Sequence, residues 1–388
     1  MRPILLCTLG TSLFHPNLEN LKGQLQTGEI RDDRRVLAEA YRDADWSDVA
    51  SALRDIPPDE RTCGAEINSV ASMIQRGHAP ADCGLVLYHS ATCQGRHVAS
   101  ILEEYYKGRG HSPVESIEVP DLQDKDAKRF RTHGLRNLVR KLCGVIRERS
   151  AAACAINATG GYKAQIAVAV LVGQALGVPV YYKHEMFSEI IAFPPLPVSF
   201  DYEIWMKASG MLFDLDDANE LTASQLFADD WDEKYESLFE RIEIDGIEYL
   251  ELSPTGQIFH ETFRERFRSN ADQVLPPAAL EKRPPRLEQA GWPGQHPEVR
   301  RFLEQVTGEI PQVAHCATTY FNPDLSERTR FRGSGDRIQG VYSDGRYCVK
   351  FAVESSAQTS GQRAAVVAML NQWLADRRSS LRIKPSTL

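Results

Sequence analysis

The sequence contains no apolar run of the roughly 18 residues that a membrane-spanning helix needs. From Met1 it passes directly into a short apolar stretch at residues 4–9, so it also lacks the pattern of a secretory signal. Its eight cysteines are widely spread and include no Cys-x-x-Cys pair, the usual spacing of zinc ligands. We therefore expect a cytoplasmic protein with no membrane partner, no structural zinc and no disulfide framework.

The sequence also has no excess of positive charge: 45 Lys and Arg stand against 53 Asp and Glu, a formal net charge of −8. This balance argues against a protein that coats nucleic acid through its overall charge. The charge is uneven, however, because residues 294–388 contain 13 Lys and Arg against 9 Asp and Glu. An interaction with RNA or DNA is therefore expected at the C-terminal end.

No internal repeat of fixed period is present, and the length of 388 residues favours two or three domains. Strands and helices alternate through residues 1–200, which predicts an α/β domain with a doubly wound parallel sheet. The sequence Pro-Pro-Leu-Pro at residues 194–197 ends this pattern.

Three further segments are expected after this boundary. Residues 201–272 combine an acidic, helical stretch at 214–239 with a hairpin around Asp245 and Gly246, which predicts a small winged-helix-like spacer or dimerisation module. The proline-rich residues 273–296 are expected to be an extended linker. Residues 297–388 predict an α+β domain: a helix, a strand at 312–321, strands at 327–341 and 346–353 that flank an Asp-Gly turn, and a closing helix.

The sequence Asn-Ala-Thr-Gly-Gly-Tyr-Lys at residues 157–163 lies between an apolar strand and an apolar helix pattern. Gly160 and Gly161 let the backbone come close to a ligand, while the first helical N–H groups and Lys163 attract an anion. The longer P-loop spacing is absent, so a βα turn that is merely tight remains an equal alternative to phosphate binding.

Two other strands end in similar turns. Gly10, Thr11 and Ser12 follow the strand at 4–9, and small hydroxyl residues with a glycine follow the strand at 84–89. Thr11 or Ser12 could instead serve only as a helix N-cap. Because open α/β sheets bind ligands at the carboxyl ends of their strands, we expect the three turns to converge on one crevice.

Four separated segments resemble the CARF domain, the Rossmann-like sensor of cyclic oligoadenylates in type III CRISPR systems: residues 5–12, 90–96, 157–163 and 181–185 with 193–197. The resemblance covers residues 1–200. It implies a homodimer that binds one ring of linked adenylates, cyclic tetra-adenylate above all, across its twofold axis. The ligand-binding residues that it implies are Gly10, Thr11, Ser12, Thr159, Gly160, Gly161 and Lys163 for phosphate and ribose, and Thr92, Gly95 and Arg96 near the bases or the dimer seam.

CARF proteins usually carry an effector domain, and two common kinds do not fit here. A HEPN ribonuclease needs an Arg-x4-6-His motif in a helical C-terminal domain, whereas the histidines after the linker region, His296 and His315, lie in no such motif. A restriction-type nuclease needs Glu-x-Lys on a strand to hold a metal ion, and the hairpin contains no such motif. We therefore expect no metal and no cofactor.

A run of basic and phenolic residues lies in and around the C-terminal hairpin, and the candidate catalytic residues are Arg328, Arg330, Arg332, Arg337, Tyr342 and Lys350. Alternation along a strand predicts that the first three share one face. Such a face can cleave RNA without metal, because cations stabilise the phosphorane while one group removes the 2′-OH proton and another assists the leaving oxygen. A basic hairpin that only binds RNA is the simpler alternative.

The segments 330–333, 336–338, 341–342 and 344–346 resemble the RelE toxin family, over about 80 residues. This resemblance implies a ribonuclease that cleaves mRNA in the ribosomal A site. The leading hypothesis is thus a homodimeric sensor-effector in which cyclic oligoadenylate activates a RelE-like ribonuclease for antiviral defence. Two alternatives remain: a CARF ring nuclease in which Ser12 and Lys163 orient a ribose 2′-OH of the ligand in line with its phosphate, and a non-catalytic, ligand-gated regulator that binds nucleic acid.

Overall fold

The computed structural model describes residues 1–123, 125–184, 189–196, 200–218, 220–222, 231, 233–287, 296–322 and 327–382. The chain divides into two compact units, Met1–Ser199 and Phe200–Leu388. Within these described ranges, no helix is both long and apolar enough to cross a membrane. Three of the segments predicted from sequence lie partly outside the described residues. These parts are residues 185 and 197 of the CARF-like segments, residues 219, 223–230 and 232 of the acidic stretch, and residues 288–295 of the proline-rich segment.

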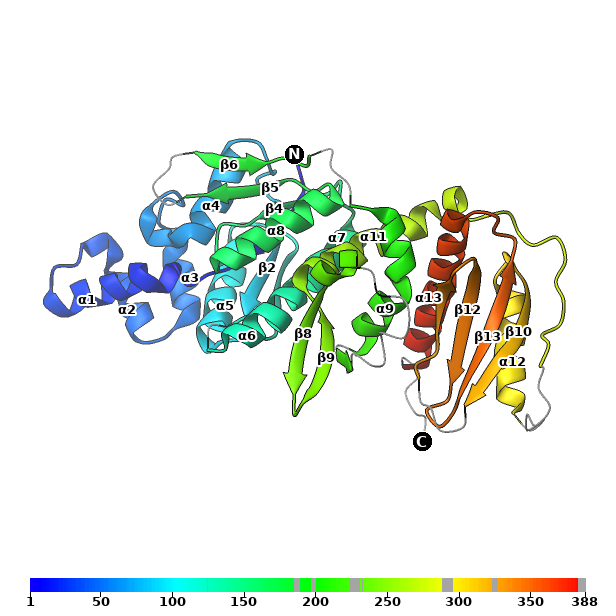
Figure 1. Cartoon of the computed structure of the whole chain (residues 1–388). Coiled ribbons are helices and arrows are strands. Elements are labelled where there is room, and N and C mark those ends of the chain that lie inside the picture. Colours follow the sequence, from blue (N-terminus) through cyan, green and yellow to red (C-terminus); the bar gives the residue numbers. More distant parts are fainter. Residues whose placement is uncertain are drawn as a thin grey trace, which may run out of the picture. The chain divides into compact units, whose positions relative to one another are not determined.

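A six-stranded sheet forms the centre of the first unit, in the order β3-β2-β1-β4-β5-β6 (Figure 1). Its strands are β1 (Ile4–Thr8), β2 (Gly84–Ser90), β3 (Val114–Val119), β4 (Cys154–Asn157), β5 (Val180–Lys183) and β6 (Ile190–Phe193). The expected α/β architecture is confirmed, with β1 to β5 parallel. The sheet is mixed, however, because β6 runs antiparallel to β5. Only six residues separate these two strands, too few for the crossover that a parallel pair requires.

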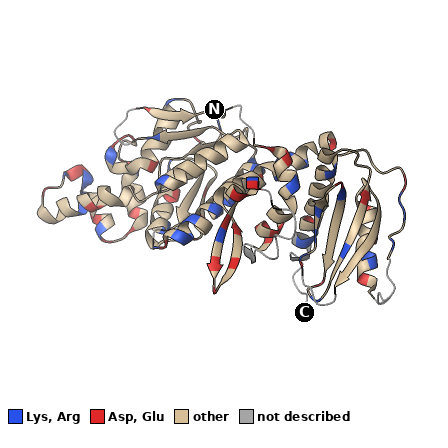
Figure 2. Ribbon diagram, viewed as in Figure 1, with Lys and Arg blue, Asp and Glu red and all other residues tan. Residues whose placement is uncertain are grey.

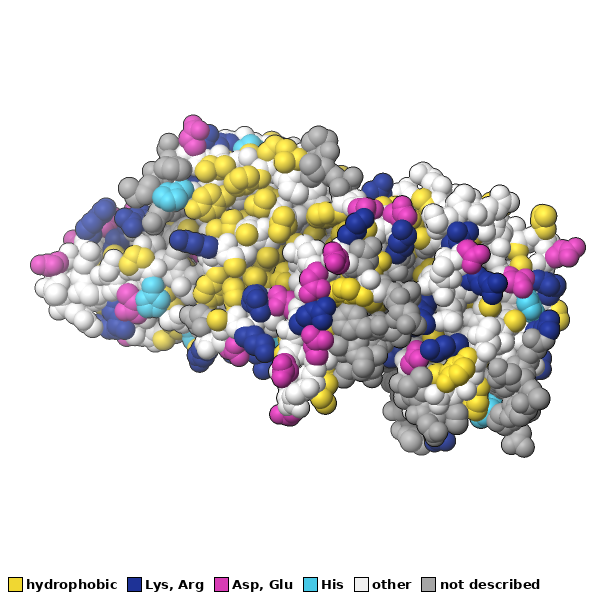
Figure 3. Space-filling model, in the orientation of Figure 1, with side chains coloured by type: hydrophobic (Ala, Val, Ile, Leu, Met, Phe, Trp, Pro, Cys, Tyr) yellow, Lys and Arg dark blue, Asp and Glu magenta, His cyan; other side chains and the backbone are white. Residues whose placement is uncertain are grey.

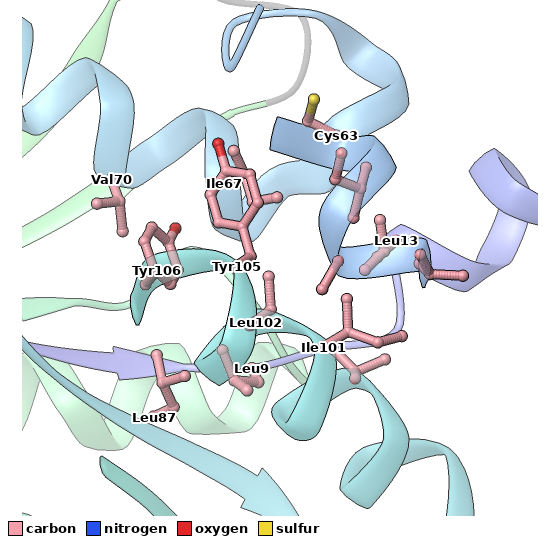
Figure 4. Packing of buried hydrophobic residues seen from close by; sticks show 14 of the residues in the cluster. Leu9, Leu13, Cys63, Ile67, Val70, Leu87, Ile101, Leu102, Tyr105 and Tyr106 are labelled. Atoms are coloured by element: carbon pink, nitrogen blue, oxygen red, sulfur yellow. The ribbon is translucent and has the colours of Figure 1, made fainter. Parts of the chain in front are cut away.

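Helices cover both faces of this sheet. They are η1 (Leu13–Leu18), α1 (Glu19–Thr27), α2 (Asp32–Arg42), α3 (Trp46–Arg54), η2 (Arg61–Cys63), α4 (Gly64–Gln75), α5 (Cys93–Gly108), α6 (Ala127–Arg129), η3 (Phe130–Gly134), α7 (Leu135–Arg149) and α8 (Lys163–Leu176). On one face, Ile67 and Val70 of α4 pack with Leu102 and Tyr106 of α5 over Leu87 of the sheet (Figure 4). Helices α7 and α8 pack together in front of the sheet in Figure 1.

The second unit contains two antiparallel sheets, β7-β9-β8 and β10-β13-β12-β11. Its elements are α9 (Tyr202–Ala218), β7 (Glu220–Thr222), η4 (Glu233–Leu238), β8 (Phe239–Ile244), β9 (Ile247–Leu252), α11 (Pro254–Val274), α12 (Pro297–Glu309), β10 (Val313–Asn322), β11 (Arg330–Ser334), β12 (Arg337–Ser343), β13 (Cys348–Ser355) and α13 (Ser360–Arg382). Asp and Glu gather on the hairpin of β8 and β9 (Figure 2).

Helix α13 joins the two sheets of this unit. Its residues Ala365 and Ala368 are buried in a core formed with α9, α11 and the small sheet. Its residues Val366 and Leu370 are buried in a second core, formed with α12 and the four-stranded sheet. Because one helix contributes to both cores, the segment predicted as a spacer module and the segment predicted as a RelE-like domain lie in a single compact unit.

Two local predictions need correction, and a third is confirmed. The strand predicted at 327–341 is two strands, since the chain reverses at Gly335, whose φ of 59° suits a tight turn. The continuous helix predicted at 214–239 ends early, because α9 ends at Ala218 and the described residues that follow include the strand β7, the 3-10 helix η4 and the start of β8. The hairpin at Asp245 and Gly246 is confirmed, with φ values of 52° and 76°.

The described part of the proline-rich segment is not a free linker. It runs along β10, where the N–H groups of Ala279, Arg283 and Arg286 donate to the carbonyls of Pro311, Ala314 and Cys316 at 2.9, 2.8 and 2.9 Å. Proline cannot donate such bonds, but it is tolerated at the edge of a sheet. The segment therefore extends the edge of the four-stranded sheet.

Candidate functional site

Strands β1 and β4 are neighbours at the point where the strand order of the first unit reverses. Their carboxyl ends lead into the loops that carry Gly10 and Gly160, and such a switch point is where open α/β sheets bind ligands. A Cβ atom on Gly10 would lie 2.6 Å from the nitrogen of Gly161, and one on Gly160 would lie 2.8 Å from the nitrogen of Gly10. The glycines are therefore needed for the two loops to touch.

The outer edge of these loops is exposed and carries a cation. Gly161 has a φ of 99°, which favours glycine, and it is exposed together with Thr11 and Lys163. Lys163 is the first residue of α8, a helix of 14 residues whose N-terminus favours negative charge. Thr11, Gly161 and Lys163 can thus form an anion-binding edge.

Ser12 points the other way, toward the buried carboxylate of Glu66 on α4. Its hydroxyl donates to Glu66 Oε2 at 2.6 Å and accepts from the N–H of Ala65 at 2.9 Å. The N–H of Gly10 donates to Glu66 Oε1 at 2.9 Å. Sequence reasoning missed Glu66, although an acidic residue within the apolar pattern of α4 was a signal that it has buried partners.

Thr159 is also engaged within the protein. Its hydroxyl donates to Asn157 Oδ1 at 2.7 Å and accepts from the N–H of Lys183 at 3.1 Å, which ties the loop after β4 to β5. These bonds hold the shape of the loop. In this arrangement Ser12 and Thr159 shape the candidate site, and Thr11 with Lys163 faces solvent.

The third turn follows β2, which lies beside β1. Thr92 caps α5 by accepting a hydrogen bond from the N–H of Gly95 at 3.0 Å, and a Cβ atom on Gly95 would collide with Ser90. Arg96 forms an ion pair with Glu118 of β3 at 2.6 Å. Since β2 and β1 separate β3 from β4, the guanidinium of Arg96 is directed toward the sheet edge rather than toward Lys163.

In the second unit, a cavity of about 370 Å³ lies beside the edge strand β11. It is lined by Lys207, Gly210, Met211, Trp231, Tyr235, Arg330, Phe331, Arg332, Gly333, Gly335, Arg337, Ser360, Arg363, Ala364 and Val367. Three of the six candidate catalytic residues are among them. Lys207 and Arg363 were missed, because they come from α9 and α13 and only the tertiary fold brings them to β11. Among the described residues that line this cavity, none is acidic.

Asn371 on α13 closes part of the edge of β11. Its side chain accepts from the N–H of Phe331 at 3.0 Å and donates to the carbonyl of Phe331 at 2.9 Å. In an antiparallel pair, backbone groups point alternately toward and away from the partner strand, so those of Gly333 also point away from β12. Gly333 is exposed, which leaves this edge accessible.

The remaining three candidates lie elsewhere. Arg328 forms ion pairs with Asp217 at 2.9 Å and Asp214 at 3.5 Å, and Lys350 forms one with Glu327 at 3.2 Å.

Tyr342 packs against Phe302 of α12, with ring centroids 4.9 Å apart, and burial raises the pKa of its phenol. Tyr342 is paired with Val349, whereas its neighbour Val341 is paired with Lys350. Because side chains alternate along a strand, Tyr342 and Lys350 lie on opposite faces of the sheet.

In the described parts of the chain, no three or more His, Cys, Asp or Glu side chains lie together in a way that could hold a metal ion. All eight cysteines are free thiols, and Cys93 alone among them is exposed. The two candidate sites thus consist of glycine loops with a lysine in the first unit, and arginines with aromatic rings in the second.

Comparison with known families agrees with this picture in part. Residues 61–196 match the profile of a family described as CRISPR-associated protein (Cas_APE2256), which supports a CRISPR-associated protein. The matched segment includes β2 to β6, the turn at 90–96 and Gly160 to Lys163. No curated protein matches the chain.

Proposed function

We propose that the chain is a CRISPR-associated ribonuclease activated by a cyclic oligoadenylate. The activator binds at the switch point of the first unit, and RNA is cleaved at the cavity of the second unit. The observation that carries the proposal is the convergence of Arg330, Arg332 and Arg337 on one cavity with Lys207 and Arg363. Five cations around one hollow, with no acidic residue among the described residues that line it, favour a polyanion.

The proposed activator is cyclic tetra-adenylate, a ring with one phosphate for each nucleotide. The charge of Lys163, the hydroxyl of Thr11 and the backbone of Gly161 supply the kind of donors that phosphate requires. A ring with twofold symmetry is best held by two copies of the loop, so we propose a homodimer.

An apolar surface supports the dimer. Figure 3 shows hydrophobic side chains gathered over α8 and the elements beside it. Leu171 of α8 is 44% exposed, Phe193 of β6 is 37% exposed and Leu196 is 59% exposed. A contiguous apolar patch on a protein surface commonly marks an interface.

The proposed chemistry is metal-independent transesterification. The ribose 2′-oxygen attacks the adjacent phosphorus and loses its proton, the bond from phosphorus to the 5′-oxygen breaks, and that oxygen gains a proton. The products are a 2′,3′-cyclic phosphate and a 5′-hydroxyl. Arg332 and Arg337 stabilise the charge that develops on the phosphorane, since guanidinium groups form paired hydrogen bonds with phosphate oxygens.

The test is an RNA cleavage assay with the full chain in EDTA, with and without ribosomes, and with each cyclic oligoadenylate in turn. We expect cleavage of mRNA on ribosomes only when the activating ring is present. Cleavage that is the same with and without every ring would contradict the activation, and cleavage abolished by EDTA would contradict the chemistry.

A second candidate function is degradation of the ring by the first unit. It is favoured because Ser12 and Lys163 follow the adjacent strands β1 and β4. It requires Ser12 to leave its 2.6 Å hydrogen bond with Glu66. Linear adenylates formed from cyclic tetra-adenylate, and lost in the Lys163→Ala variant, would support this activity.

A further inference from the structure

We infer that α9, Trp231 and η4 are parts of the RNA site: the cavity accepts one unstacked nucleotide of a single strand, with its base against Trp231 and Tyr235 and its phosphate held by Lys207 and the cavity arginines. This inference rests on the proposed function in taking RNA as the polymer. It assigns a recognition role to residues outside the RelE-like segment at 297–388.

The size of the cavity fits a single nucleotide. Its volume of about 370 Å³ lies at the lower end of the range of about 300–1,000 Å³ that is usual for small-ligand sites. A base pair would need more room. The RNA must therefore enter as a single strand with one base turned out of its stack.

Neighbouring side chains hold the aromatic ring of Trp231 in place. The Trp231 indole has the guanidinium of Arg241 at 5.2 Å from its ring centroid, and the rings of Phe239 and Tyr235 at 5.6 and 6.0 Å. These contacts fix the indole before any ligand arrives. A pre-positioned aromatic ring is what proteins use to stack a single base with little preference for its identity.

The exposed basic side chains of the cavity can bind a phosphate without losing a strong ion pair. Lys207 is 52% exposed and forms an ion pair with Glu203 one turn away on α9, and exposed pairs of this kind contribute about 0–1 kcal/mol. Arg337 is 81% exposed, and its Nε lies 3.9 Å from Oδ1 of the likewise exposed Asp336. Arg332 donates to Gln339 Oε1 at 2.9 and 2.7 Å, which holds its guanidinium beside the cavity.

The open edge of β11 favours a nucleotide over an added peptide strand. Asn371 occupies the backbone groups of Phe331, and a Cβ atom on Gly210 of α9 would lie 2.9 Å from the Phe331 carbonyl. The accessible edge is thus limited to the residues around Gly333, which is too short for strand pairing. Its backbone groups can still meet the hydrogen-bonding edge of one base.

The experiment measures binding separately from cleavage. The probe is a fluorescent, single-stranded 2′-O-methyl RNA decamer, which lacks the attacking hydroxyl, and its anisotropy is followed with the full chain and cyclic tetra-adenylate. We expect Trp231→Ala and Lys207→Ala each to weaken binding by about tenfold. Trp231→Phe keeps an aromatic ring and Lys207→Arg keeps the charge, so both should restore most of the affinity. Arg300→Ala, which removes an exposed cation of α12 outside the cavity, should change nothing.

The outcomes separate this inference from the proposed function. If Trp231→Ala and Lys207→Ala both bind the RNA decamer with wild-type affinity, the inference is overturned, even if the chain cleaves RNA. Weakened binding in these variants supports it, even where no RNA is cleaved and the proposed function fails. Binding of adenosine or uridine monophosphate as tight as that of the decamer would overturn the assignment to an RNA chain in favour of a free nucleotide. Circular dichroism of each variant checks that it is folded. If Trp231→Ala loses affinity and Trp231→Phe does not restore it, the stacking role of Trp231 is overturned as well.

Discussion

The Glu66 carboxylate accepts a hydrogen bond from the Ser12 hydroxyl at 2.6 Å and another from the Gly10 N–H at 2.9 Å. Glu66 is 3% exposed and lies directly beneath the glycine loops of the candidate ligand site. It therefore fixes the shape of the loop after β1, but it also brings an acidic group close to the place proposed for a phosphate. These two effects have opposite consequences for ligand binding.

The Glu66→Gln variant separates the two effects. The amide oxygen can still accept one of the two hydrogen bonds, while the negative charge is removed. We expect cyclic tetra-adenylate to bind roughly tenfold more tightly, because repulsion between the carboxylate and phosphate is relieved. Isothermal titration calorimetry measures this directly. Weaker binding in Glu66→Gln would mean that the loop shape matters more than the charge.

Lys163→Ala tests the exposed cation of the same site. Loss of a charge-assisted hydrogen bond to phosphate should weaken ring binding by roughly tenfold to a hundredfold. The thermal unfolding of the variant should match that of the wild type, since Lys163 is exposed. Lys141→Ala removes an exposed lysine of α7 and is the matched control. Equal affinity in the two variants would place the ligand elsewhere.

Much of the first unit could be predicted from sequence because its signals are local. The apolar run before Gly160 and the apolar helix after it define a strand, a turn and a helix without any tertiary information, and the strand order then brings Gly10 to Gly161. Glu66 was missed because its role depends on two hydrogen bonds to residues more than 50 positions away.

The second unit was harder to predict because its cavity is made by distant segments. The run Arg330 to Arg337 pointed to a basic surface, but nothing local shows that Lys207 and Arg363 reach the same hollow. The turn at Gly335 was also missed, although the sequence Gly-Ser-Gly-Asp at residues 333–336 favours a turn, because the arginines on both sides fit the pattern of one strand. Missing that turn led to one long strand where the structure has β11 and β12.

Arg332→Ala and Arg337→Ala test the proposed ribonuclease chemistry. Each variant should lower the rate of activated RNA cleavage by about a hundredfold, because a preorganised donor to the phosphorane is lost. Binding of cyclic tetra-adenylate should be unchanged. Arg346→Ala, in the exposed turn between β12 and β13 and outside the cavity, should cleave at the wild-type rate. Full activity in both cavity variants would show that the catalytic groups lie elsewhere.

The apolar surface of α8 gives a prediction for the oligomeric state. Leu171→Glu puts a charge into the exposed apolar patch and should convert the proposed dimer into monomers. Light scattering coupled to gel filtration measures the change in mass. Val36→Glu on α2 makes the same change at a residue that is 67% exposed, and it should leave the dimer intact. A dimer that survives Leu171→Glu would exclude α8 as the interface.

The ion pairs of Asp214 predict a large effect on the stability of the second unit. This fully buried carboxylate on α9 lies 2.9 Å from Arg378 of α13 and 3.5 Å from Arg328, which precedes β11. Asp214→Ala would remove the carboxylate that Arg378 pairs with, while Arg328 keeps its ion pair with Asp217 at 2.9 Å, and the loss of a buried partner costs about 3–5 kcal/mol. Urea unfolding should therefore show a markedly lower midpoint. Asp376→Ala removes an exposed partner of Arg268, whose pair contributes about 0–1 kcal/mol, and serves as the control. Equal midpoints for the two variants would mean that water replaces the Asp214 carboxylate and that the contact between α9 and α13 is held by its apolar residues alone.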